Sequence, residues 1–300
     1  MNNTSDNSNL LYKVKDMASA IKLAEMSEAF SSDKLSKINT ALSELTNSLY
    51  EFKEEVDYHD TELEGKIFRF VLANSSFINL LNKTPSKLSN KMFNVLDLST
   101  INSVTRMQIE SFLMIYYLSF SEGSIDEKDM RYDLYRLHGL KKQSGFSVKS
   151  KYGESKKAAL EKEFDSVLSQ LKSRQIFTDL NGKLRNKLLK LSHAKIIKPD
   201  ILFTESGLSR FGTDELWSLY SNHTHSEYIS DRQFNSNYKK LRSKSLSAQI
   251  NIQFHIILTA KLCRFLIDKF ESPKKVIPRI DETSRALIYT LGYKVGGNKL

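Results

Sequence analysis

An arginine and a glutamate stand four residues apart in an otherwise apolar stretch of the chain. At that spacing Arg106 and Glu110 fall on one face of a helix, together with Leu113 and Tyr117. Charges on a central helix must be paired, because an isolated buried charge carries a large desolvation cost. The pair predicts either a buried ion pair that fixes helix register or, with a third group from another helix, a functional polar centre.

A second polar set lies about a hundred residues further on, in the string LWSLYSNHTHSE. Trp217, Ser221 and His225 are spaced by four, so they share one face of a continuing helix. Histidine titrates near neutral pH, so His225 could act as a general acid or base. The alternative is a helix-terminal histidine bonded to a neighbouring group. His223 points elsewhere and no third ligand is evident, so we expect no zinc site here.

Arg131 and His138 bracket six residues in the string RYDLYRLH, and Arg185 and His193 bracket seven in RNKLLKLSH. An Arg and a His four to six residues apart on a helix resembles the site of the HEPN ribonucleases (higher eukaryotes and prokaryotes nucleotide-binding domains). In such a site His assists proton transfer at the ribose 2′-hydroxyl, and Arg stabilises phosphate charge. Arg131 and His138 are therefore a second choice of catalytic pair, although Tyr132 replaces the usual small polar residue.

Basic residues crowd between Arg131 and Lys198. The chain has a formal charge of +10 and a pI near 9.3, which favours an anionic partner such as RNA, DNA or an acidic protein surface. The alternative is a generic solvated basic surface. The residues predicted to bind nucleic-acid phosphates are Lys141, Lys142, Lys183, Arg185, Lys187 and Lys190.

The elements that must position these residues are predicted to be helices. Only 11 Gly and 4 Pro occur in 300 residues, too few for the regular turns of a sandwich or barrel. Apolar residues recur at spacings of three and four, and the segment 99–121 is apolar on nearly every side, as expected of a central helix. The predicted helices cover about 10–29, 34–56, 62–81, 99–121, 129–140, 154–174, 181–191, a stretch beginning with Thr213 as N-cap, 247–270 and 282–291.

These patterns predict an all-α helical bundle. We expect a disordered tail at 1–9, one helical domain at 10–272 and a peripheral tail at 273–300. Loops are expected at 144–153 and 195–210. The stretch from about 144 to 198 is expected to be a basic polar insertion. Cys263 is the single cysteine, the first residues lack a signal-peptide pattern, and the longest apolar stretches are short or interrupted by charge. We therefore expect a cytoplasmic protein without a membrane partner.

The order of these features resembles a family of bacterial helical proteins distantly related to HEPN domains. Its pattern is Arg-x-x-x-Glu on a central apolar helix, followed by an aromatic residue, a Ser and a His at four-residue spacing. Trp217 stands where that family has Tyr, and the basic stretch 144–198 departs from its pattern. The resemblance covers about 35–270 and implies a bundle in which Arg106, Glu110 and His225 converge on one polar site.

We expect an RNA-binding HEPN-like protein or a metal-independent endoribonuclease, in a bacterial stress or phage-defence setting and without a cofactor. Arg106, Glu110, Ser221 and His225 would form its catalytic centre. The alternative is a non-catalytic helical module that binds a protein partner or forms a homodimer, and a small-ligand sensor is a third reading. No Gly-rich phosphate loop, HExxH motif or carboxylate cluster with metal-ligand spacing supports a nucleotide-hydrolysing or zinc-protease class.

Overall fold

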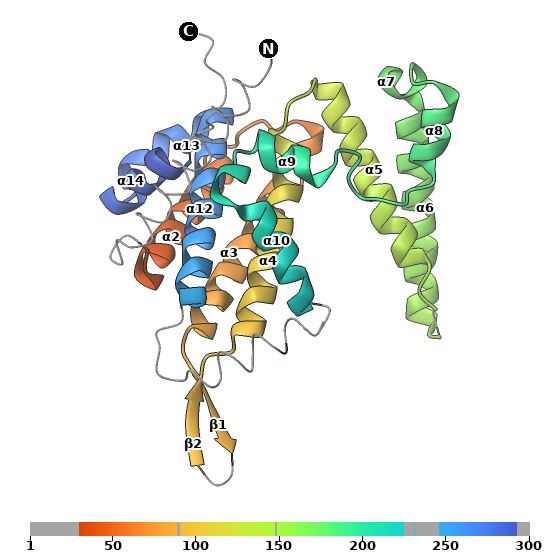
Figure 1. Cartoon of the computed structure of the whole chain (residues 1–300). Coiled ribbons are helices and arrows are strands. Elements are labelled where there is room, and N and C mark those ends of the chain that lie inside the picture. The colour runs from red at the N-terminus through yellow and green to blue at the C-terminus, as the bar shows by residue number, and fades with distance from the viewer. Residues whose placement is uncertain (1–29, 89–90, 148, 225–230, 232–245, 293–300) are drawn as a thin grey trace, which may run out of the picture. The chain divides into compact units, whose positions relative to one another are not determined.

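The computed structural model describes residues 30–88, 91–147, 149–224, 231 and 246–292. Within these ranges the chain is helical apart from one β-hairpin (Figure 1), which confirms the predicted all-α class. The predicted tail at 1–9, the predicted helix at 10–29 and His225 lie outside the described residues.

The described residues divide into two compact units, and each is treated by itself. We call the first the bundle unit, which comprises the described residues within 1–55, 64–115 and 203–300. The second is the basic unit, which comprises the described residues within 56–63 and 116–202. The predicted division into a tail, one helical domain and a second tail stays a prediction.

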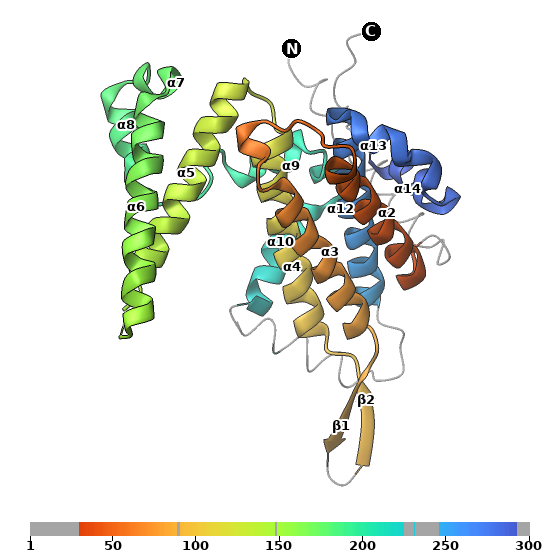
Figure 2. The ribbon, with the colours of Figure 1, turned by 180° about the vertical axis from the view of Figure 1, so that it is seen from behind.

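Four long helices run side by side in the bundle unit (Figures 1 and 2): α2 (Ser32–Glu51), α3 (Leu63–Leu80), α4 (Leu98–Ile115) and α12 (Leu246–Lys269). Ser31 caps α2 by accepting a hydrogen bond from the Lys34 amide at 3.2 Å. The inner face of α2 carries four leucines and Ile38 at helical spacing, and all five are buried. This amphipathic pattern is why the sequence predicts the helix correctly.

The most enclosed helix of the bundle unit is α12, which packs against α2, α4 and α14 (Glu282–Leu291). Within the described ranges, Ser247–Lys269 is the one helix long and apolar enough to cross a membrane. In this fold 89% of its most apolar window is buried inside the protein. Its all-round hydrophobicity is therefore that of a core helix in contact with other helices.

Shorter helices cover the bundle. The helix α10 (Thr213–Thr224) packs against α4, and α13 (Glu271–Val276) packs against α2, followed by η4 (Ile277–Arg279). Gly292 follows α14 at a point where the chain lies against α12. A Cβ atom at this position would stand only 2.6 Å from the Arg264 Cβ atom, so a larger residue would not fit. The predicted helix at 282–291 is confirmed.

Two local predictions are wrong, and one element was not predicted. The expected loop at 195–210 contains α9 (Pro199–Glu205) and η3 (Ser209–Phe211), with Pro199 in the first helical position, which its fixed φ suits. Thr213 is already helical, and its hydroxyl donates to the Leu208 carbonyl at 3.1 Å instead of capping α10. The structure also has an unpredicted antiparallel hairpin, in which β1 (Thr84–Leu88) pairs with β2 (Lys91–Val95).

The basic unit is built on two antiparallel helices, α5 (Ile125–Ser144) and α6 (Lys151–Ser173), followed by α7 (Gln175–Thr178) and α8 (Gly182–Leu189). A π-helical segment, η2 (Tyr116–Phe120), leads into it, and η1 (Tyr58–Asp60) also belongs to it. Its separate apolar core contains Met130, Leu134, Leu137, Leu140, Val167, Leu171, Phe177 and Leu191. This core holds together the helices that carry Arg131, His138 and the basic residues described below.

Candidate functional site

Trp217 on α10 is the third member of the polar centre that was predicted on α4. The Trp217 indole Nε1 donates to Glu110 Oε1 at 2.8 Å, and Arg106 Nη2 lies 3.4 Å from the same oxygen. The Arg106 guanidinium also lies over the indole ring, 5.2 Å from its centroid. Arg106, Glu110 and Trp217 are therefore brought together by the spacing that the sequence analysis identified.

This centre is partly open to solvent, since the Arg106 and Glu110 side chains are 18% and 35% exposed. The Arg106 Nε atom is buried and has no hydrogen-bond partner among the described residues. Ser221 is half-buried on α10, and His225 lies outside the described residues. The convergence of His225 on this centre stays a prediction, and the described part can hold an anion through the remaining guanidinium donors.

Arg131 and His138, the second choice of catalytic pair, make contacts with different partners. The buried Arg131 donates to Ser121 Oγ at 2.7 Å and to the Glu122 carbonyl at 3.0 Å, and it forms an ion pair with Glu127. His138 Nδ1 lies 2.8 Å from the Leu191 carbonyl oxygen. Each side chain thus anchors a neighbouring chain segment in the basic unit, and no shared catalytic arrangement connects them among the described residues.

The basic residues gather in the second unit. Residues 141–198 contain 15 Lys and Arg and 5 Asp and Glu, so this stretch carries a formal charge of +10, equal to that of the whole chain. Among the residues predicted to bind phosphate, Arg185 is half-buried and the five lysines are exposed. Lys141 Nζ donates to the Lys190 carbonyl at 2.8 Å, which joins the end of α5 to the end of α8.

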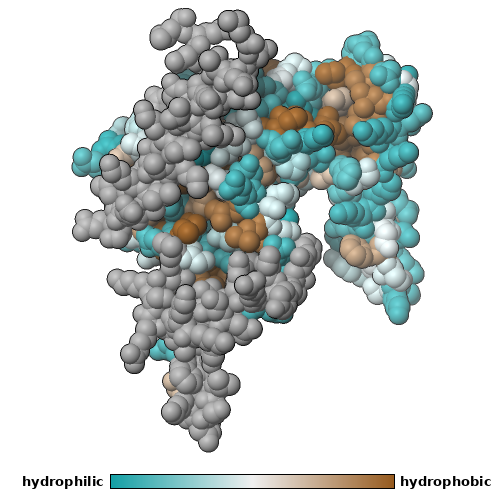
Figure 3. All heavy atoms as spheres, viewed as in Figure 1, coloured by the Kyte–Doolittle hydropathy of each residue, from teal (hydrophilic) through white to brown (hydrophobic). Residues whose placement is uncertain are grey.

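Two aromatic side chains interrupt this basic stretch, and the sequence analysis did not single them out. Phe146 and Tyr152 are 70% and 74% exposed. Lys156 Nζ lies 5.6 Å from the Tyr152 ring centroid, so a cation stands beside an open aromatic face. The face of this unit visible in Figure 3 is largely hydrophilic with separate hydrophobic patches. The alternation of lysines and aromatics in KKQSGFSVKSKY is the signal that could have identified these residues.

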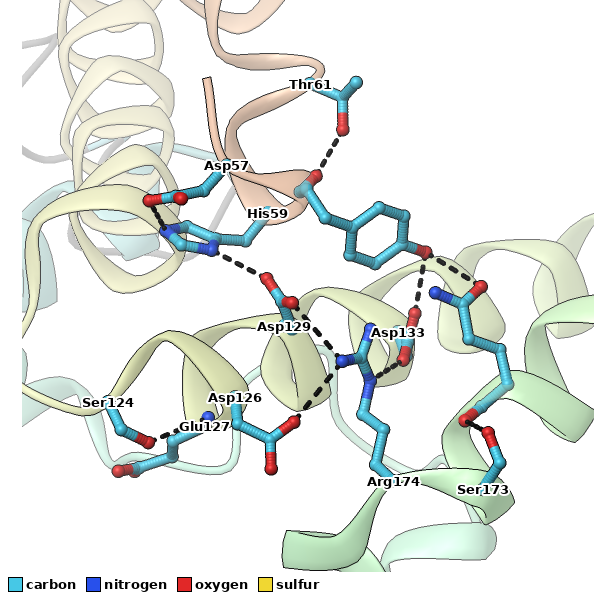
Figure 4. Close-up of polar contacts among 12 residues, drawn as sticks. Asp57, His59, Thr61, Ser124, Asp126, Glu127, Asp129, Asp133, Ser173 and Arg174 are labelled. Atoms are coloured by element: carbon cyan, nitrogen blue, oxygen red, sulfur yellow. Dashed lines mark hydrogen bonds and ion pairs between the residues drawn. The ribbon is translucent and has the colours of Figure 1, made fainter. Parts of the chain in front are cut away.

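A charged network ties η1 to α5 and to the end of α6 (Figure 4). Arg174 donates from Nε to Asp133 Oδ2 at 2.5 Å, and its Nη1 lies 3.3 Å from Asp129 Oδ2 and 3.5 Å from Asp126 Oδ1. The Tyr58 hydroxyl donates to the other Asp133 oxygen at 2.8 Å. Burial raises the pKa of Asp133, whereas the hydrogen bonds from Arg174 and Tyr58 act to lower it. The network thus stabilises a buried carboxylate.

His59 lies on the other side of Asp129 in this network (Figure 4). Its Nδ1 atom is 2.8 Å from Asp129 Oδ1, and its Nε2 atom faces Asp57 Oδ2 at 3.8 Å and Asp60 Oδ2 at 3.6 Å. Asp57, His59 and Asp60 offer ligand atoms that all lie within 4.8 Å of one another, so they could hold a metal ion. Sequence reasoning missed this group because the string DYHD has no helical period.

The buried polar residues of the bundle unit form a different kind of network, centred on Asn74. Asn74 Oδ1 accepts from Gln108 Nε2 at 2.7 Å and lies 2.8 Å from His255 Nδ1, and Asn74 Nδ2 donates to Asn39 Oδ1 at 2.9 Å. Phe77 stacks on the imidazole ring of His255, with the two centroids 3.7 Å apart. Desolvation lowers the pKa of His255 to about 3, so this histidine is neutral near pH 7. The network joins α2, α3, α4 and α12.

No protein-family model, curated protein or solved structure gives a significant match to this chain.

Proposed function

We propose that this chain binds single-stranded RNA on the basic unit. The observation that carries the proposal is the concentration of exposed lysines on the stretch 141–198, which accounts for the whole formal charge of the protein. Lysine side chains attract phosphates and release their counterions, which is the main source of sequence-independent affinity for nucleic acids. The Lys141 contact with the Lys190 carbonyl brings the basic residues at the end of α5 close to those at the end of α8.

The exposed aromatics favour a single strand over a duplex. Unpaired bases stack on open aromatic faces, and such stacking is tolerant of base identity. Phe146 and Tyr152 lie within the basic stretch and expose most of their surface, and Lys156 adds a cation beside Tyr152. A duplex keeps its bases stacked internally, so it would use the lysines alone.

Binding of a fluorescent single-stranded RNA of mixed sequence tests the proposal. The double variant Lys187→Gln/Lys190→Gln is expected to weaken binding by roughly tenfold at low salt, because it removes two phosphate contacts. The matched control, Arg69→Gln/Lys83→Gln, removes two exposed basic residues from the bundle unit and should change the affinity by less than about twofold. Equal losses in the two variants would reject the basic unit as the binding surface.

The chain could also cleave the RNA that it binds, as an endoribonuclease. The feature that supports this activity is the polar centre in which Glu110 forms an ion pair with Arg106 and accepts a hydrogen bond from Trp217. Purified protein would be incubated with total bacterial RNA, with and without EDTA, beside Arg106→Ala and His225→Ala. EDTA-resistant cleavage that is absent from both folded variants supports a HEPN-like nuclease. Cleavage retained in His225→Ala removes that residue from any catalytic role.

A protein-interaction module is the second candidate function. Phe68 and Leu72 stand one turn apart on α3, with 58% and 49% of their surfaces exposed, which is the kind of apolar surface that partners cover. If a second copy covers it, light scattering should find a dimer that the double variant Phe68→Ser/Leu72→Ser converts to a monomer. A monomeric wild-type protein would argue against self-association.

A further inference from the structure

We propose that Asp57, His59 and Asp60 form a binding site for one divalent transition-metal ion of the zinc type. The site lies wholly in the basic unit and does not depend on RNA binding. Nitrogen and oxygen ligands of this kind are those that zinc accepts in proteins.

The ligand atoms have the separations that a shared ion requires. Zinc–nitrogen and zinc–oxygen distances are about 2.1 Å, so two such ligands at a tetrahedral angle stand roughly 3.4 Å apart. His59 Nε2 lies 3.6 Å from Asp60 Oδ2 and 3.8 Å from Asp57 Oδ2. These separations are close to those of two ligands on one ion, and longer than the roughly 3 Å of a direct hydrogen bond.

Asp129 orients the histidine for this role. A carboxylate accepts hydrogen bonds, so the 2.8 Å contact with Asp129 Oδ1 places the proton on His59 Nδ1. Nε2 is then the atom that faces Asp57 and Asp60 and that would supply a lone pair to an ion. A carboxylate on the far nitrogen of a histidine is the usual outer partner of a metal ligand, because it fixes the ring and raises its basicity. Arg174 in turn holds Asp129 at 3.3 Å.

The local charge also favours a cation. Five carboxylates contact either Arg174 or His59, namely those of Asp57, Asp60, Asp126, Asp129 and Asp133. Arg174 and Arg136 act to lower the pKa of Asp133, so they offset part of this negative charge. The His59 and Asp60 side chains are 1% and 0% exposed, where solvent screens charge poorly, so a divalent ion beside them would reduce the repulsion between the Asp57 and Asp60 carboxylates. Asp57 is 42% exposed and gives the ion a route from solvent.

The proposal predicts a site with three protein ligands and one coordination position for water. It also departs from the expectation, drawn from the sequence, that the chain holds no metal. The alternative is that Nε2 of His59 carries a proton and faces the two carboxylates without a metal ion. A titration with zinc distinguishes a metal site from this protonated histidine.

The full chain would be treated with EDTA, freed of chelator and titrated with Zn²⁺ by calorimetry. Asp57→Asn is the main variant, because its side chain is exposed and its loss should leave the fold intact. Asp126→Asn is the matched control: that carboxylate is 48% exposed and touches the same network through Arg174, but it does not face His59 Nε2. Circular dichroism confirms folding of both.

We expect one Zn²⁺ per chain, a loss of affinity of tenfold or more in Asp57→Asn, and a change of less than about threefold in Asp126→Asn. No stoichiometric binding to the wild type, or an equal loss in the two variants, would overturn the proposal. The Lys187→Gln/Lys190→Gln variant separates this site from RNA binding, since it should bind zinc normally even if it binds RNA poorly. A zinc affinity that falls with those lysines would also count against the Asp57 site.

Discussion

The polar network around Asn74 in the bundle unit and the one around Asp129 in the basic unit are built by opposite means. The bundle unit uses neutral amides, hydroxyls and one uncharged histidine around Asn74, whereas the basic unit uses carboxylates, arginines and His59 around Asp129. Neutral groups lose less solvation on burial than charges do, so they can join helices deep in a core. Buried charges must instead be paired, as Asp133 is with Arg174.

The polar groups therefore have different roles in the two units. In the bundle unit, polar contacts specify how α2, α3, α4 and α12 pack. The basic unit has two charged regions. Basic residues predominate at 141–198, and carboxylates surround His59. We expect the former to attract polyanions and the latter to attract cations.

The largest expected effect comes from removing the centre of the neutral network. Asn74→Ala should lower the free energy of unfolding by on the order of 4 kcal/mol, because several buried partners would lose their hydrogen bonds at once. Chemical denaturation measures this loss, with the exposed Ser76→Ala on the same helix as control. A loss below about 1 kcal/mol would mean that the network is not needed for packing.

The corresponding change in the charged network is Arg174→Ala. It leaves the buried Asp133 carboxylate without its guanidinium, and removal of one partner from a buried pair costs about 3 kcal/mol. Hydrogen exchange should show the loss in α5 and α6. Lys172→Ala, an exposed change in the same last turn of α6, is the control and should leave exchange unaltered.

Acid should weaken the bundle unit through His255. The folded pKa of about 3 lies below the usual value of 6.5, so the unfolded chain takes up the proton first. The stability present above pH 6.5 is therefore lost as pH falls toward 3, by about 1.4 kcal/mol per pH unit, or about 2 kcal/mol at pH 5. Denaturant titrations at pH 7, 6 and 5 measure this slope. The slope should be reduced in His255→Gln, and an unchanged slope would assign the acid sensitivity to other groups.

The smallest effect concerns the contact between α4 and α10. Trp217→Phe keeps an aromatic ring beside Arg106 and Phe203 but removes the indole donor to Glu110. One hydrogen bond to a partly exposed carboxylate contributes about 1 kcal/mol. A double-mutant cycle with Glu110→Ala, which removes the acceptor, isolates this energy, and a coupling near zero would show that Trp217 acts through packing alone.

Helical periodicity predicted the fold well because most helices bury one apolar stripe. It also identified Arg106, Glu110 and Trp217, since a spacing of four places residues on one face. It missed the His59 group, which depends on a 3-10 turn meeting a helix some 70 residues later. Asp126, Asp129 and Asp133 do share a face of α5, and that acidic stripe was a readable sign of a charged partner. The partner itself, Arg174, could not be inferred from local sequence.

The most direct test of the central claim is the salt dependence of RNA binding. For single strands, the logarithm of affinity falls with the logarithm of salt concentration by about 0.7 for each phosphate contacted. Replacing Lys141, Lys142, Lys187 and Lys190 with Gln should therefore reduce the slope by roughly 3, with folding unchanged. Identical slopes for the wild type and this variant, or affinity that does not respond to salt, would contradict the assignment of RNA binding to the basic unit.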